Sequence, residues 1–258
     1  MAKKRKRRRQ LDMAVATIHR RYGPQALVKG KPISAAGVPH IPTGFPALDR
    51  ALGTGGLPKG KICELVGPAT SGKTTLALKF LARAQAAGGQ VAYADQALYF
   101  DPDYAHRCGL DLSRLLVGKP HDLREALAMT EALVHSGGLA ALVFDALDFL
   151  WTDAEAAQLL TTTLNRLLVT LSRAGAVLLV LHESLAGSAP GGEGPTLSAL
   201  AHHAAVRLQV VRERWLHTHQ DIRGYEARVS IQKNQLGPAG RTVLLTIEFN
   251  GTVQGNGL

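Results

Sequence analysis

One nine-residue segment constrains the fold of this chain more than any other. It reads Gly67-Pro68-Ala69-Thr70-Ser71-Gly72-Lys73-Thr74-Thr75 and matches the phosphate-binding pattern G-x-x-x-x-G-K-[ST] at every position. An apolar run at residues 62–66 precedes it and a helical pattern follows it, as such a loop requires. The glycines let backbone N–H groups turn toward phosphate oxygens, and a helix N-terminus favours negative charge. The segment therefore predicts a phosphate-binding loop. A chance glycine-rich turn is the alternative, which the matching flanks disfavour.

Two further assignments concern a metal ion. In such a loop Lys73 reaches the β- and γ-phosphates, and the Thr74 hydroxyl holds Mg²⁺. Asp145 follows the most apolar run of the chain, residues 139–144, and an acid at the end of a strand is the expected second metal ligand. A helix N-cap is the alternative for Asp145, because a helix must begin nearby.

Apolar runs and helical patterns alternate along the middle of the chain. The expected strands are residues 62–66, 90–94, 114–117, 140–145 and 176–182, and the expected helices are 74–87, 102–108, 121–136 and 154–174. This alternation predicts an α/β fold with a mostly parallel sheet and helices on both faces. Three alternating segments, residues 205–212, 225–233 and 242–249, predict antiparallel strands added at the C-terminal end. Residues 184–197 are rich in glycine and proline and predict a long loop.

The positive charge lies at the N-terminus. Residues 1–31 hold eleven Lys or Arg and one acid out of totals of 30 and 20, so the rest of the chain has 19 of each and is neutral. Residues 1–10 predict a disordered basic tail that binds DNA or another polyanion. The cations of the tail are Lys3, Lys4, Arg5, Lys6, Arg7, Arg8 and Arg9. A solubilising tail is the alternative.

An amphipathic pattern follows the tail. Leu11, Val15, Ile18 and Tyr22 recur at helical spacing, which predicts a helix over residues 11–22. A proline-rich linker at residues 28–42 follows. A helix of about three turns is marginal alone, so it must dock on its own core or on another protomer.

Composition also indicates the cellular compartment in which we expect the protein. Two cysteines do not make a disulfide framework, and no apolar run approaches the roughly 20 residues needed to span a membrane. The N-terminus lacks the apolar region of a secretory signal. We therefore expect a cytoplasmic protein with no membrane partner.

Several segments together resemble the bacterial RecA recombinase family. They are residues 41–60, the phosphate loop, Asp101-Pro102-Asp103-Tyr104-Ala105, residues 228–235 with Lys233-Asn234-Gln235, and the N-terminal helix, and the likeness covers about residues 11–253. The resemblance implies a RecA-type P-loop NTPase core at residues 43–258 that binds ATP between protomers. It also implies that Asp101 and Tyr104 flank the adenine, that Lys233 is a candidate catalytic residue across the protomer interface, and that residues 11–42 mediate self-association into a filament.

The chain departs from the family at positions that matter for hydrolysis. Ala97 stands where the family has the Glu that activates water, with Asp95 and Gln96 as displaced substitutes. His182-Glu183 replaces the Asn-Gln pair that senses the γ-phosphate, although an ordinary histidine at a strand end is the simpler interpretation of His182. Gln235 replaces the second interface lysine.

The DNA-binding parts differ as well. Residues 184–197 contain no Lys, Arg or aromatic residue, and the stretch from Asp145 to His182 is short for the family's first DNA loop. The chain as given stops at Leu258, before the family's separate C-terminal domain. These differences predict a shortened, diverged paralogue.

The resemblance leaves three functions open. The first is an ATP- and Mg²⁺-binding protein of DNA recombination or repair that binds single-stranded DNA and hydrolyses ATP weakly or not at all. The second is an active DNA-dependent ATPase with strand-exchange activity. The third is a non-catalytic adaptor for a polymerase or a recombinase, similar to ImuA-type proteins.

Overall fold

The computed structural model describes residues 2–24, 26–27, 37–145, 154–183, 200–218, 221–249 and 253–257. The chain divides into two units, Met1–Ser34 and Ala35–Leu258. The long loop expected at residues 184–197 lies outside the described residues.

The N-terminal unit contains the helix α1 (Ala2–Tyr22). It begins nine residues before the predicted start at Leu11, so the segment expected to be a disordered tail is helical instead. Lys and Arg are good helix formers, which explains the extension through the basic run. The helix ends where expected: Gly23 has a φ of 89° and its N–H donates to the carbonyl of His19.

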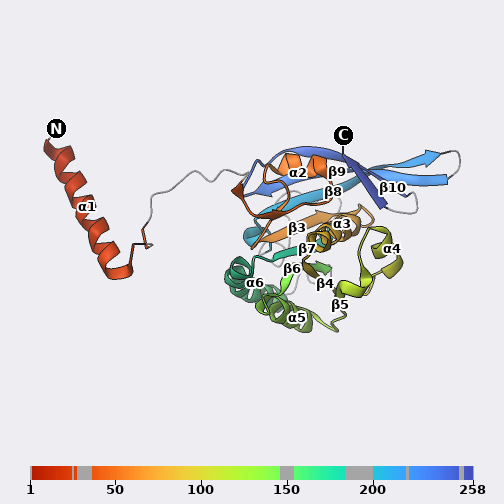
Figure 1. Cartoon of the computed structure of the whole chain (residues 1–258), viewed down its shortest axis with the longest axis horizontal. Coiled ribbons are helices and arrows are strands. Elements are labelled where there is room, and N and C mark those ends of the chain that lie inside the picture. Colours follow the sequence, from red (N-terminus) through yellow and green to blue (C-terminus); the bar gives the residue numbers. More distant parts are fainter. Residues whose placement is uncertain are drawn as a thin grey trace. The chain divides into compact units, whose positions relative to one another are not determined.

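The larger unit is built on a nine-stranded sheet (Figure 1). Its order is β11-β10-β9-β8-β3-β7-β6-β4-β5. The strands are β3 (Ile62–Gly67), β4 (Gln90–Asp95), β5 (Leu115–Gly118), β6 (Leu139–Asp145), β7 (Val177–Glu183), β8 (Val206–Thr218), β9 (Asp221–Asn234), β10 (Thr242–Phe249) and β11 (Val253–Gly257). Neighbours from β8 to β5 are parallel, and those from β8 to β11 are antiparallel. This confirms the predicted parallel sheet with antiparallel strands at its C-terminal end.

Helices cover both faces of the sheet, as predicted. The helices are α2 (Pro46–Leu52), α3 (Lys73–Ala86), α4 (Pro102–Arg107), α5 (Leu123–His135) and α6 (Ala154–Ala174), and a short pair of strands, β1 (His40–Ile41) and β2 (Leu57–Pro58), lies apart from the main sheet. One core contains residues of α2, α3 and α4, and the other contains residues of α5 and α6. Within the described parts of the chain, no helix combines the length and the apolar character needed to cross a membrane.

Side chains of the parallel strands alternate between these two cores. Odd-numbered residues such as Leu65, Tyr93, Val143 and Leu181 belong to the core under α3. Even-numbered residues such as Val180 belong to the core under α5 and α6. This period of two decides which face of the sheet each polar side chain near the phosphate loop occupies.

The strands β8 and β9 form a long antiparallel ribbon. Both run further than the sequence predicts, with 13 and 14 residues, and Figure 1 shows their paired ends continuing beyond the helices. The first part of β8 pairs with β3 in parallel, and its register with β3 ends at Gln209. The ribbon therefore continues past the carboxyl end of β3, which is where the phosphate loop begins.

Candidate nucleotide-binding site

The phosphate loop Gly67–Thr75 joins β3 to α3, as predicted. The Lys73 ammonium donates to the carbonyls of Gly67 (2.8 Å) and Pro68 (2.9 Å), so it lies over the mouth of the loop. A Cβ on Gly67 would approach the carbonyl oxygen of Val210 to 2.1 Å. A Cβ on Gly72, which has a φ of 105°, would approach the Tyr225 hydroxyl to 2.8 Å. Both glycines are therefore required by their surroundings.

These residues fit a nucleotide phosphate with Mg²⁺. α3 has 14 residues, and its first-turn N–H groups have no partners within the helix. The Ser71 hydroxyl is buried in the loop and has no hydrogen-bond partner among the described residues. Thr74 is exposed at the first turn of α3, where its hydroxyl is able to ligate a metal ion. The loop thus offers backbone donors, an ammonium and hydroxyls in one place.

Asp145 lies at the carboxyl end of β6, half-buried, on the face of the sheet that carries α3. Its carboxylate accepts a hydrogen bond from the Tyr93 hydroxyl of the neighbouring strand β4. Burial, and after it the charge of Asp145, raises the pKa of Tyr93 far above its usual value, so this hydroxyl is a donor. The sequence analysis missed Tyr93, whose partner is 52 residues away in the chain.

The segment after β4 has no carboxylate in the position of the expected catalytic Glu. Ala97 occupies that position, and its N–H points to the carbonyl of Asp145 at 3.3 Å. Asp95 is 2% exposed, and its two carboxylate oxygens accept from the N–H groups of Tyr99 (3.0 Å) and Phe100 (3.1 Å). The N–H of Gln96 also donates to the carbonyl of Asp145, at 2.6 Å. Asp95 therefore stabilises the backbone of its own turn.

Asp101 and Tyr104 mark the start of α4. Asp101 is the N-cap of this helix, and its carboxylate accepts from the N–H of Tyr104 at 3.1 Å. The Tyr104 hydroxyl lies 2.6 Å from the hydroxyl of Thr75, the last residue of the phosphate loop. Burial raises the pKa of Tyr104 above its usual value. Tyr104 is therefore joined to the loop, whereas Asp101 holds the helix that carries Tyr104.

The ribbon β8–β9 contacts the phosphate loop at two points that the sequence analysis did not identify. The Tyr225 hydroxyl donates to the Thr75 hydroxyl at 2.9 Å, and burial raises the pKa of Tyr225. The Arg212 guanidinium donates to the carbonyl of Thr70 at 2.9 Å and lies 4.2 Å from the ring centroid of Trp215. Neither contact has a local sequence signal, because Arg212 and Tyr225 lie 142 and 150 residues along the chain from their partners in the loop.

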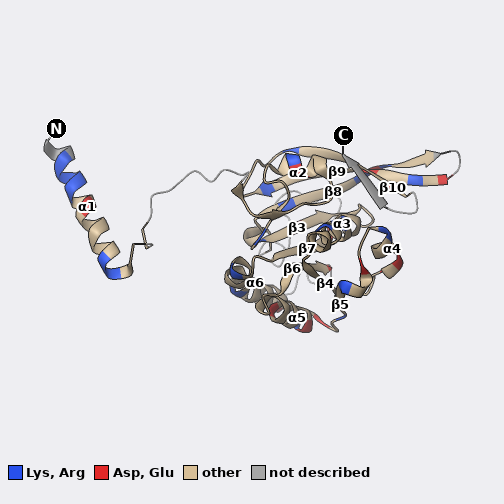
Figure 2. Cartoon of the chain, in the orientation of Figure 1, with Lys and Arg blue, Asp and Glu red and all other residues tan. Residues whose placement is uncertain are grey.

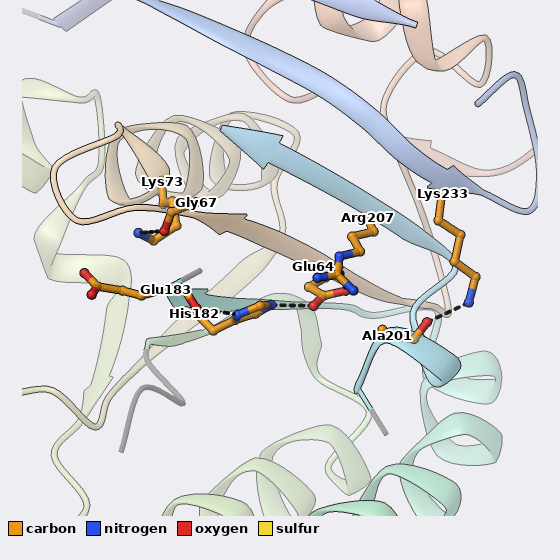
Figure 3. A network of polar contacts seen from close by, with 8 residues as sticks. All are labelled: Glu64, Gly67, Lys73, His182, Glu183, Ala201, Arg207 and Lys233. Atoms are coloured by element: carbon orange, nitrogen blue, oxygen red, sulfur yellow. Dashed lines mark hydrogen bonds and ion pairs between the residues drawn. The ribbon is translucent and has the colours of Figure 1, made fainter. Parts of the chain in front are cut away.

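His182 and Glu183 lie on opposite faces of β7. His182 is fully buried on the α5–α6 face, and its Nε2 is hydrogen-bonded to the carboxylate of Glu64 (Figure 3). Arg207 Nε lies 3.6 Å from the second oxygen of Glu64, an ion-pair distance that is too long for a hydrogen bond. Glu64 was missed, although a charged residue inside the apolar run 62–66 was a visible signal.

Glu183 is on the face of the phosphate loop. Its Cα pairs directly with that of Gly67 in the register of β3 with β7. Its side chain is half-buried and, in Figure 3, points away from the Glu64–His182 pair. A carboxylate thus belongs to the residue that pairs with the first residue of the loop.

Lys233 is bound within its own chain. Its ammonium donates to the carbonyls of Ala201 (2.8 Å) and His202 (2.9 Å), at the end of the short helical turn 200–203 (Figure 3). Burial lowers the pKa of Lys233, and the nearby charge of Glu64 opposes this shift. The neighbouring Asn234 side chain donates to the carbonyl of Leu52 at 3.0 Å. Both residues fasten β9 to adjacent segments.

The predicted DNA-binding cations belong to the separate N-terminal unit. Arg5 to Arg9 are exposed on α1, and Figure 2 shows the basic residues concentrated in the first half of this helix. In the larger unit, Lys and Arg as well as Asp and Glu are scattered over many elements (Figure 2). The ribbon, for example, pairs Arg214 with Glu226 and Arg228 with Glu213.

The comparisons with known proteins agree with this geometry. The family model of the RecA N-terminal domain matches residues 9–254. Protein RecA of Symbiobacterium thermophilum is 36% identical over 250 residues, covering 88% of this chain and 70% of that protein. Protein RecA of Brucella anthropi is 34% identical over 96% of this chain and 73% of its own length. A crystal structure of the RadB recombinase shares the fold, with a TM-score of 0.67 and 21% identity over 84% of this chain and 99% of that one. The chain therefore belongs to the RecA family.

Proposed function

We propose that this protein is a RecA-like, ATP-binding protein of DNA recombination or repair that binds single-stranded DNA and hydrolyses ATP weakly or not at all. Lys73 and the backbone donors of the phosphate loop bind the phosphates. Thr74 and Asp145 hold Mg²⁺, directly or through water, and Asp101 and Tyr104 flank the adenine. The bound metal ion neutralises phosphate charge, which is the chemistry that it supplies in such sites.

The proposal of weak hydrolysis rests on the residues that follow β4. Ala97 has no group that takes a proton from water, and both carboxylate oxygens of Asp95 are held by backbone N–H groups. General-base catalysis supplies roughly 10²–10⁴-fold in rate, so a site without it turns over slowly. Lys233 is engaged with two carbonyls of its own chain and has to leave them before it serves a neighbouring protomer. The nucleotide then acts as an assembly cofactor more than as a fuel.

Binding and turnover test this proposal separately. Lys73→Ala is expected to remove most of the thermal stabilisation that Mg·ATP gives the wild type, which is about 2.7 kcal/mol at a hundred times the dissociation constant. Equal binding of a fluorescent ATP analogue by both proteins would contradict the phosphate-loop assignment. Steady-state turnover is then measured with and without single-stranded DNA. Fast turnover that DNA stimulates would replace the proposal by an active strand-exchange ATPase.

A further inference from the structure

The end of β4 holds Asp145 at both its main chain and its side chain. The Asp145 carbonyl accepts from the N–H groups of Gln96 and Ala97, and its carboxylate Oδ2 accepts from the Tyr93 hydroxyl. Asp95 pairs with Asp145 in the register of β4 with β6, and Tyr93 pairs with Val143 two residues earlier, on the same face of the sheet. The residue that is proposed to hold a metal ion is therefore held at its main chain and its side chain by the neighbouring strand and the residues that follow it.

Tyr93 is itself closely packed. It is 1% exposed, and its ring packs on Phe100 with the centroids 5.0 Å apart and an angle of 54° between the planes. Tyr93 and Asp145 also share the face of the sheet that carries α3 and the phosphate loop. A buried tyrosine hydroxyl needs a partner, and here that partner is the carboxylate. The ring packing thus determines where the hydroxyl lies, and the hydroxyl determines how the carboxylate is turned.

We infer that Tyr93 is a positioning residue for the metal-binding carboxylate: by holding Oδ2, it sets the direction in which Asp145 presents Oδ1 to Mg²⁺ of the bound nucleotide. The inference rests on the proposed function, since it requires that the chain bind Mg·ATP. Groups that hydrogen-bond to metal-ligating carboxylates fix their orientation, and their loss typically weakens metal binding 10- to 100-fold. Tyr93 acts on nucleotide binding only through Asp145.

The test measures the Mg²⁺ dependence of nucleotide binding and does not use catalysis. The full chain is titrated with MgCl₂ at a fixed concentration of fluorescent ATP analogue, starting from excess EDTA. Tyr93→Phe keeps the buried ring and removes the hydroxyl, and it is expected to raise the half-saturating Mg²⁺ concentration 10- to 100-fold. Binding in EDTA is expected to stay within about twofold of the wild type, because the phosphate loop is unchanged.

Two further variants separate positioning from packing. Tyr99→Phe makes the same chemical change at a side chain that is 81% exposed and is expected to leave the Mg²⁺ dependence unaltered. In an Asp145→Asn background, Tyr93→Phe is expected to add no shift of its own, because both substitutions remove the same positioned carboxylate. Thermal unfolding without nucleotide checks that each variant is folded.

The outcomes are distinct. An unchanged half-saturating Mg²⁺ concentration in Tyr93→Phe, with Mg²⁺-dependent binding in the wild type, would overturn the inference and leave the proposed function standing. An equal shift from Tyr93→Phe in the wild-type and Asp145→Asn backgrounds would also overturn it, because Tyr93 would then act through packing alone. Absence of nucleotide binding by the wild type would overturn the proposed function and the inference together.

Discussion

Glu64 is a charged residue in the middle of a buried strand, and its side chain has no access to solvent. A carboxylate is stable there only because cations or donors surround it, and His182 and Arg207 lie on its two sides. The three residues come from β3, β7 and β8, which are adjacent in the sheet. The buried group thus ties the strand that leads into the phosphate loop to both of its neighbours.

Removing this carboxylate is expected to be costly. Glu64→Ala takes the carboxylate away from His182 and Arg207 in the interior, and it is expected to lower the free energy of unfolding by about 3–5 kcal/mol. Urea denaturation measures the change. Glu155→Ala, which removes a carboxylate that is 87% exposed, is the control and is expected to change stability by less than about 0.5 kcal/mol. A loss below about 1 kcal/mol for Glu64→Ala would show that the buried pair contributes little net stability.

Glu183 is expected to influence which nucleotide the site prefers. Its carboxylate is on the face of the phosphate loop, opposite Gly67, so it opposes the additional negative charge of a γ-phosphate. Two like charges about 10 Å apart repel by roughly 1–2 kcal/mol at an effective dielectric constant of about 20. Glu183→Gln is therefore expected to strengthen ATP binding relative to ADP by about tenfold.

Competition titrations with ATP and ADP against a fluorescent analogue measure this ratio. Glu183→Asp keeps the charge and is expected to keep the wild-type preference. A ratio that is the same in Glu183→Gln and the wild type would mean that the carboxylate does not act on the terminal phosphate.

The residues that sequence reasoning missed share one property. Glu64, Tyr93 and Tyr225 bond to partners 118, 52 and 150 residues away in the chain. A local motif identifies the phosphate loop because its residues are consecutive, whereas these contacts depend on which strands are neighbours. Strand order is not encoded in periodicity, so the partners of these polar groups could be identified only in the structure, even for Glu64, whose position in an apolar run was itself a signal.

At the scale of the elements, periodicity predicted most boundaries well. α6 was predicted at residues 154–174 and lies at Ala154–Ala174, and β10 was predicted at 242–249 and lies at Thr242–Phe249. The wrong boundaries occur in exposed segments, where burial does not impose a regular spacing of apolar residues. α1 extends into the basic run, where helix propensity alone decides, and β8 continues to Thr218 through mostly exposed residues.

The helix α1 carries an apolar face that its own unit leaves largely uncovered. Leu11 and Tyr22 are 64% and 65% exposed, and Val15 and Ile18 lie on the same face at helical spacing. We expect this face to dock on another protomer, so that Val15→Glu with Ile18→Glu shifts the protein toward monomer. Analytical ultracentrifugation with and without ATP measures the shift.

The matched control places the same charges on the other side of α1. Ala16→Glu with Thr17→Glu alters two exposed positions that lie about 130° around the helix from the apolar face, and it is expected to leave assembly unchanged. An oligomer of unchanged size in the Val15/Ile18 variant, or a wild type that stays monomeric with ATP, would contradict the role of α1 in assembly.

At the scale of the whole molecule, the net charge is concentrated in one part of the chain. All of the net charge of +10 is carried by residues 1–31, and the remaining 227 residues are neutral. α1 displays its cations on an exposed helix, with Arg5 to Arg9 in consecutive positions. Consecutive residues of a helix point in all directions around its axis, so only part of this set faces a given strand of DNA at once. We therefore expect the basic segment to contact DNA through phosphates, independently of base sequence.

Truncation of the chain before Leu11 tests whether this segment provides the affinity for DNA. Each phosphate that a cation neutralises on single-stranded DNA adds about 0.7 to the slope of log K against log salt. Removal of residues 1–10 deletes seven cations and is expected to weaken binding strongly and to flatten this slope by about 2–4, since only some cations bind at once. Fluorescence anisotropy with labelled oligonucleotides at several salt concentrations measures both quantities. Substitution of Lys3 to Arg9 by Gln, which keeps the chain length, separates charge from helix length. Full affinity with an unchanged slope in both variants would move the DNA site into the larger unit.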